Sequence, residues 1–172
     1  AIMKSGDPYG FSLKSTKPLK ILVINCGSSS LKFALYNTNE SGNTIQGKVE
    51  RIGTGGTLLS ATVEGKQVRK ALPAGNHEDA FRAVCELIHS PVTDSSIGPD
   101  DITAVGHRVV HGGDRFPHPV LVTENVLEEI ESLSPLAPLH NPVNLAGIRA
   151  AMKHYPNAAH VGLHLAEAVR PH

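Results

Sequence analysis

The stretch ILVINCGSSSLKFALY, residues 21–36, decides the fold. Residues 21–24 form an apolar run that is rich in β-branched side chains and short enough to be a buried strand. Residues 25–30 hold small polar side chains and one glycine, which favours a tight turn. Leu31, Phe33 and Leu35 then alternate along one face of a second strand. The stretch therefore predicts a β-hairpin.

The turn of this hairpin has a composition that suits anion binding. Small residues let backbone N–H groups and hydroxyls approach an anion closely, because no bulky side chain stands in the way. Lys32 follows the turn and supplies a positive charge within reach of the same ligand. The alternative is an ordinary hairpin with a polar tip, and composition alone does not separate the two.

The residues after the hairpin predict more strands and then helices. Apolar and polar residues partly alternate in residues 44–52 and 58–64, on either side of the glycine-rich residues 53–56, and this pattern predicts a second hairpin. Residues 65–70 are predicted to form a further short strand. Helical spacing of apolar residues begins at His77, after the capping residue Asn76, and places Cys85 in the core. Further helices are predicted over 124–132 and from Asn141, with strands at 102–105 and 158–163. Strands followed by alternating helices and strands indicate an α/β fold with a mixed sheet and flanking helices.

Composition limits the class of protein. The 172 residues suffice for one domain with a proper core, and equal numbers of acidic and basic residues (16 each) give no sign of a nucleic-acid or membrane partner. Two cysteines are too few for a disulfide scaffold and fit a reducing compartment. No apolar run approaches the length of a membrane span, and residues 1–19 lack the apolar core of a secretory signal. We therefore expect a cytoplasmic protein, and a start at Ala1 rather than Met leads us to expect a processed or partial sequence.

Three motifs occur in series: NCGSSSLK (25–32), VGHRVVHGG (105–113) and LAPLHNPVNLAGI (136–148). Together they resemble the acetate kinase family, from about Lys20 to about Val161. The resemblance implies the actin/Hsp70/sugar-kinase ATPase fold, which is ribonuclease H-like, with this chain as its N-terminal domain. It also implies the reaction of ATP with acetate or propionate to give ADP and an acyl phosphate, with Mg²⁺. The expected organisation is a flexible extension (1–19), the family-like domain (20–161) and a divergent tail (162–172).

The acceptor side of the predicted site centres on Arg108. A guanidinium matches a carboxylate or a phosphate in bidentate geometry, whereas the alternative is a surface salt bridge. The resemblance implies that Arg108 binds both the acetate carboxylate and the transferring phosphoryl group. It further implies a catalytic role for His140, and a small methyl pocket formed by Val110 and Leu139. Without the resemblance, His140 would be a structural hydrogen-bonding residue and the two apolar residues would be core.

The nucleotide side of the predicted site is the hairpin itself. Asn25 is a neutral oxygen donor at a strand end, suited to Mg²⁺ through water, and the resemblance implies that it helps to bind the metal. The resemblance also assigns Ser28, Ser30 and Lys32 to ATP. The alternatives are a turn asparagine, ordinary turn serines and a solvated lysine. Two histidines, His107 and His111, bracket Arg108, but no cysteine or carboxylate lies at ligand spacing, so a zinc site is not expected.

The resemblance breaks after Val161. The family continues there with a strand that ends in Asp-Thr-Ala-Phe-His, whose aspartate is catalytic, but here Leu165 occupies the aspartate position and Glu167 lies two residues late. The family's second histidine and second arginine, its adenosine loops, its metal-binding glutamate and its dimer-forming domain have no counterpart in these residues. We therefore expect weak or no activity from this chain alone, with a frameshift, an altered splice or a truncation as its origin.

Two alternatives remain. One is a non-catalytic fragment that binds phosphate, and the other is a sugar kinase or chaperone-type ATPase of the same fold. The run around Arg108 argues against the second alternative, because those relatives do not carry it.

Overall fold

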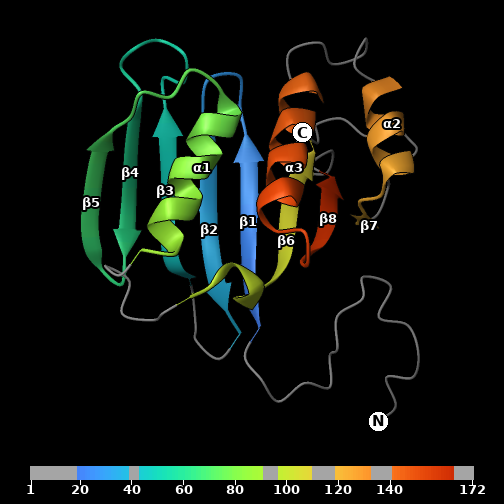
Figure 1. Ribbon diagram of the computed structural model, residues 1–172, viewed down its shortest axis with the longest axis horizontal. Helices are drawn as coiled ribbons and strands as arrows, with labels where there is room; N and C mark the ends of the chain where they lie inside the picture. Colours follow the sequence, from blue (N-terminus) through green and yellow to red (C-terminus); the bar gives the residue numbers. More distant parts are fainter. Residues whose placement is uncertain (1–18, 39–42, 91–96, 110–118, 133–140, 165–172) are drawn as a thin grey trace, which may run out of the picture.

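The predicted hairpin forms the centre of a single sheet (Figure 1). The computed structural model describes residues 19–38, 43–90, 97–109, 119–132 and 141–164. Its strands are β1 (Lys20–Cys26), β2 (Leu31–Asn37), β3 (Asn43–Glu50), β4 (Leu58–Val63), β5 (Lys66–Ala71), β6 (Ile102–Val109), β7 (Val120–Leu121) and β8 (Ala159–His164). Within the described residues their order across the sheet is β5-β4-β3-β2-β1-β6-β8-β7.

The sheet has an antiparallel half and a largely parallel half, which meet at β1. On one side, strands β1 to β5 form a meander in which each strand pairs antiparallel with the next. On the other side, β1 pairs parallel with β6, and β6 parallel with β8, while the short β7 runs antiparallel along β8. Leu22 is thus opposite Leu35 in one neighbour and opposite Val105 in the other. The mixed sheet and both predicted hairpins are confirmed.

Helices α1 (His77–Ile88) and α3 (Asn141–His154) cover one face of this sheet, and α2 (Glu124–Ser132) packs beside α3 (Figure 1). The predicted cap of α1 is confirmed, because the Asn76 side chain accepts a hydrogen bond of 2.8 Å from the Asp79 N–H. This bond satisfies one of the N–H groups that a helix start leaves unpaired. A 3₁₀ turn, η1 (Pro99–Asp101), leads into β6.

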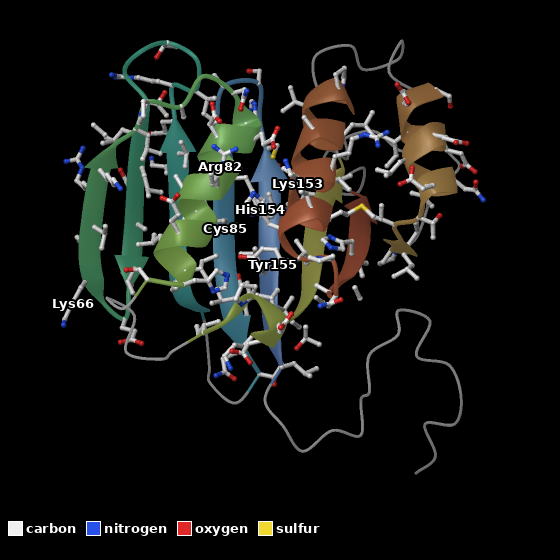
Figure 2. All side chains as sticks on the ribbon, viewed as in Figure 1. Lys66, Arg82, Cys85, Lys153, His154 and Tyr155 are labelled. Carbon is white, nitrogen blue, oxygen red and sulfur yellow. The ribbon has the colours of Figure 1, made fainter. Side chains whose placement is uncertain are left out.

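The core lies between the sheet and the two covering helices. Alternate residues of β1 (Leu22, Ile24 and Cys26) are buried on the helix side, as a strand with one covered face requires. Figure 2 shows Cys85 of α1 and Tyr155, which follows α3, in the layer where the two helices approach each other. A second, smaller cluster holds α2 against α3 and consists of Val122, Leu127, Ile130, Leu145 and Ile148.

The structure differs from the sequence-based expectation in the limits of two strands and in two short elements. β6 continues to Val109 rather than ending at Val105, and β8 runs from Ala159 to His164, one residue later at each end than expected. Strand β7 and turn η1 were not predicted. Residues 1–18 and 165–172, most of the expected extension and tail, lie outside the described residues. In the part of the chain that is described, no helix combines the length and apolarity needed to cross a membrane.

Candidate functional site

Four structural features meet at one edge of the sheet. Strands β1, β6 and β8 run parallel, so their carboxyl ends share this edge. The turn between β1 and β2, here called the hairpin turn (Gly27–Ser30), lies at the same edge, together with the N-termini of α1 and α3 (Figure 1). In open α/β sheets, ligands bind outside the carboxyl ends of the parallel strands. This edge is therefore the candidate site.

The hairpin turn is closed by its own backbone. The Gly27 N–H donates to the Ser30 carbonyl at 2.9 Å, and the Ile52 N–H donates to the Ser29 carbonyl at 2.9 Å. Ser28 and Ser29 are exposed. A Cβ atom added to Gly27 would lie 2.6 Å from the Ser30 hydroxyl oxygen, so a larger residue here would displace the Ser30 side chain.

Two of the predicted nucleotide-side residues, Asn25 and Lys32, are cross-strand partners in β1 and β2. They share the sheet face opposite to α1 and α3, since Ile24 and Cys26 on either side of Asn25 are buried against the helices. Asn25 is half-buried and Lys32 is exposed. On the far side, Lys32 is opposite Lys48 of β3, which forms an ion pair of 2.9 Å with Glu50.

Arg108 comes to the same face of the sheet from β6. His107, which precedes Arg108, is opposite Ile24 of β1. Because the two strands are parallel, the residues that follow this pair, Asn25 and Arg108, lie next to each other. Because side chains alternate along a strand, both project from the face that lies away from α1 and α3. Arg108 is exposed, and it makes no ion pair or hydrogen bond with any residue that the structure describes. A free guanidinium at this position can bind an anion in bidentate geometry.

The structure brings together Asn25, Ser28, Ser30, Lys32 and Arg108 among the predicted site residues. The other three, Val110, Leu139 and His140, lie outside the described residues, and their roles stay predictions.

His107, next to Arg108, is part of a buried histidine pair. Its Nε2 lies 3.1 Å from Nδ1 of His160 in β8, and Nε2 of His160 donates to the Tyr155 carbonyl at 2.8 Å. Burial, with a smaller contribution from His160, lowers the pKa of His107 to about 3, and burial lowers the pKa of His160. His107 is therefore a neutral structural group that joins β6 to β8, not a general acid or base.

The two cysteines are likewise unreactive. Burial raises the pKa of the Cys26 thiol to about 12. Burial is also the largest cause that raises the pKa of the Cys85 thiol, to about 11. Both thiols are free in the structure. Thiolate chemistry is therefore not a property of this site.

Two residues at the edge were not predicted to be functional. His77, the first residue of α1, places Nε2 2.7 Å from the Gly27 carbonyl oxygen. Asn144, in the first turn of α3, is 3% exposed, and neither polar atom of its amide has a partner among the described residues. Asn144 lies inside the motif of residues 136–148, but the sequence does not show that its amide is buried without a hydrogen-bond partner. Nothing in the local sequence indicates that His77 reaches a turn fifty residues earlier.

Comparison with known proteins identifies the family. The model of the acetokinase family matches residues 20–165. The chain belongs to this family. An acetate kinase from Carboxydothermus hydrogenoformans is 42% identical over 146 residues, covering 84% of this chain and 37% of that protein. An acetate kinase from Fusobacterium nucleatum is 45% identical over 151 residues, with the same coverage of 84% and 37%.

Solved structures of the acetokinase family have the same fold. The acetate kinase of Porphyromonas gingivalis superposes with a TM-score of 0.79 at 35% identity, covering 90% of this chain and 41% of that one. A propionate kinase from Francisella tularensis gives a TM-score of 0.75 at 37% identity, covering 85% and 36%. The predicted actin/Hsp70-like α/β fold is therefore confirmed. The chain spans little more than a third of the length of the curated relatives quoted above.

Proposed function

We propose that this chain is the N-terminal part of an acetate-kinase-type phosphotransferase, which converts ATP and acetate or propionate to ADP and an acyl phosphate. Phosphoryl transfer depends on positioning the reactants and on neutralising charge around the phosphoryl group. The hairpin turn and Lys32 would bind the ATP phosphates, and Arg108 would bind the acceptor carboxylate and the transferring group. His140 would act beside them, with the methyl group of the acid against Val110 and Leu139.

The observation that carries this proposal is the position of Arg108. An exposed guanidinium, with no partner among the described residues, lies on the strand next to the one that ends in the hairpin turn. Burying this positive charge against an uncharged ligand would be costly. A carboxylate or phosphoryl group would instead neutralise the charge and accept its hydrogen bonds. The three motifs and the family match support the same assignment.

The described residues offer few metal ligands of their own, which fits a metal ion that binds together with the nucleotide. No cluster of three or more carboxylate, histidine or cysteine side chains exists in the described part of the chain. Asn25 offers one neutral oxygen at the end of β1, and Mg²⁺ in kinases commonly keeps several waters and binds substrate phosphates. We therefore propose that Asn25 contacts Mg²⁺ through water; the metal would neutralise phosphate charge.

The test is a hydroxamate assay for acyl phosphate with Mg-ATP and acetate, repeated with propionate. It compares the chain itself with a chimera in which residues 20–164 are joined to the part of the Carboxydothermus enzyme that follows its matched region. We expect turnover from the chimera and little or none from the chain alone. Arg108→Ala should lower turnover of the chimera by about a hundredfold, the usual cost of losing one charge-stabilising donor.

Arg149→Ala is the matched control, since Arg149 is an exposed arginine on α3. It should leave turnover within about twofold, as surface substitutions away from a site generally do. A chimera that keeps its activity without Arg108 would refute the proposed role of this residue. Full turnover by the chain alone would refute the expectation that it is incomplete. Phosphate binding without turnover in any form would favour the alternative of a non-catalytic fragment.

A further inference from the structure

His77 joins α1 to the hairpin turn through two carbonyl groups. Its Nε2 lies 2.7 Å from the Gly27 carbonyl oxygen and 3.2 Å from the Ser30 carbonyl oxygen. A carbonyl oxygen can only accept, so Nε2 carries the proton and donates to both oxygens. The ring is half-buried. Since His77 is the first residue of a helix whose start is fixed by the Asn76 cap, its position relative to the turn is fixed as well.

The carbonyl groups of the hairpin turn are largely occupied by the protein. Gly27 accepts from His77, Ser29 accepts from the Ile52 N–H, and Ser30 accepts from both His77 and the Gly27 N–H. The N–H groups of Ser28, Ser29 and Ser30, in contrast, form no hydrogen bond within the described residues. A turn whose carbonyl oxygens are occupied and whose N–H groups are free has hydrogen-bond donors to offer an anion.

We propose that His77 is a positioning residue for the phosphate site, which keeps the carbonyl oxygens of the hairpin turn bonded to the protein and its N–H groups available to the nucleotide. The inference rests on the proposed function, since it requires that the turn binds phosphate. If His77 loses its N–H donor, the Gly27 carbonyl loses its hydrogen bond to His77. The Ser30 carbonyl keeps only the hydrogen bond from the Gly27 N–H. The peptide groups of the turn can then rotate and bring negative oxygen atoms toward the phosphate.

A purely structural role for His77 predicts something different. His89, at the other end of α1, also makes two hydrogen bonds: Nδ1 to the Ile97 carbonyl at 2.6 Å and Nε2 to the Tyr155 hydroxyl at 2.9 Å. It is also half-buried, and it joins the helix end to the core without touching the hairpin turn. His89 is thus a matched control for loss of stability without loss of the turn.

The experiment is a titration of the whole ¹⁵N-labelled chain with Mg-ATP, followed through the amide signals of Ser28, Ser29 and Ser30. His77→Gln keeps an N–H donor of similar reach, while His77→Met keeps the volume and removes the donor. We expect wild type and His77→Gln to bind within about twofold of each other, and His77→Met to bind about tenfold more weakly, as loss of hydrogen bonds of this kind implies. His89→Met should lower the melting temperature but leave the dissociation constant unchanged.

The possible outcomes separate the two claims. If wild type and His77→Met bind equally well, with the same amide shifts, the inference fails and the phosphate role of the turn stands. If Mg-ATP moves none of the turn amides in the wild type, both fail. Because His77→Met could unfold, the tautomer of His77 is measured in the wild type by long-range ¹H–¹⁵N correlation. A proton on Nδ1 rather than Nε2 would overturn the inference without any variant.

Discussion

His107 and His160 form a hydrogen-bonded chain whose direction can be assigned. Nε2 of His160 donates to a carbonyl, so its Nδ1 must accept, and Nε2 of His107 is the donor in the 3.1 Å contact between the rings. The rings are stacked, with centroids 5.4 Å apart. Protonating His160 on Nδ1 would place two donors against each other. Because both rings are buried, the neutral form of the pair is favoured over a charged one.

This pair predicts that acid destabilises the fold. The pKa of His107 falls from 6.5 to about 3 on folding, so the unfolded chain binds more protons between these values and the free energy of unfolding decreases as the pH drops. For one histidine the loss amounts to about 2 kcal/mol between pH 8 and pH 5. Urea unfolding across this range should show it, and His107→Gln should flatten the slope. If the free energy of unfolding of the variant depends on pH as steeply as that of the wild type, a group other than His107 takes up the proton.

At this scale, sequence motifs indicated the residues that we propose to bind a ligand, but not the residues that would support them. The stretch around Arg108 and the turn serines are recognisable because their spacing along the chain is fixed. His77 and Asn144 are different, since their surroundings arise only on folding. His77 contacts a turn fifty residues earlier, and the Asn144 amide is buried without a hydrogen-bond partner among the described residues. Periodicity within one helix contains neither piece of information.

At the scale of elements, α3 contacts β1 through a glycine. A Cβ atom added to Gly147 would lie 2.6 Å from the Sγ atom of Cys26, which is buried at the end of β1. This distance is shorter than any ordinary contact, so the buried Cys26 side chain, the helix or the strand would have to shift. The absence of a side chain at residue 147 thus lets α3 lie close to the end of β1.

We predict that Gly147→Ala destabilises the protein by about 1–3 kcal/mol, although alanine is the better helix former by about 1 kcal/mol. The double variant with Cys26→Ala should be less destabilised than the sum of the two single changes, since it removes the sulfur that alanine meets. Chemical denaturation of the four proteins measures this coupling. Additive effects would show that the contact between α3 and β1 is looser than described.

The sequence predicted the type of most elements correctly and their limits less well. In α1 the apolar spacing placed five residues inward; all are buried except Leu87, which is half-buried, and Cys85 is buried as well (the five are Ala80, Phe81, Val84, Leu87 and Ile88). β6 was expected to end before its polar residues, but it continues because His107 is buried by pairing with a histidine of β8. β7 is two residues long and is defined only by its pairing with β8. Such pairings between distant segments leave no local pattern.

At the scale of the whole molecule, the described sheet has a charged edge. β5 forms one end of the strand order, and its residues are exposed except for the half-buried Val68. It carries Lys66, Arg69 and Lys70, and Figure 2 shows Lys66 directed outward from this edge. Charged residues on an edge strand oppose pairing with the edge of another molecule.

Replacing Lys66, Arg69 and Lys70 together by threonine should therefore increase self-association, while the melting temperature changes little. Static light scattering at increasing protein concentration measures the association. The reason is that threonine favours extended structure and leaves the N–H and C=O groups of the edge unprotected.

A matched control removes the same number of positive charges from the helices, by replacing Arg82, Arg149 and Lys153 with glutamine. These side chains are exposed on α1 and α3. If the control associates as strongly as the edge variant, net charge and not the strand edge is responsible.

The central position of β1 also determines the order in which the molecule can assemble. During synthesis β1 is followed directly by β2 to β5, so the antiparallel half needs only short loops to form. The other edge of β1 must wait for β6, which emerges after α1, and closing this long loop has a larger entropic cost. Until then, β1 presents an unpaired edge next to an uncovered apolar face. The hairpin turn can thus form early during synthesis, whereas Arg108 reaches it only after β6 has emerged and paired with β1.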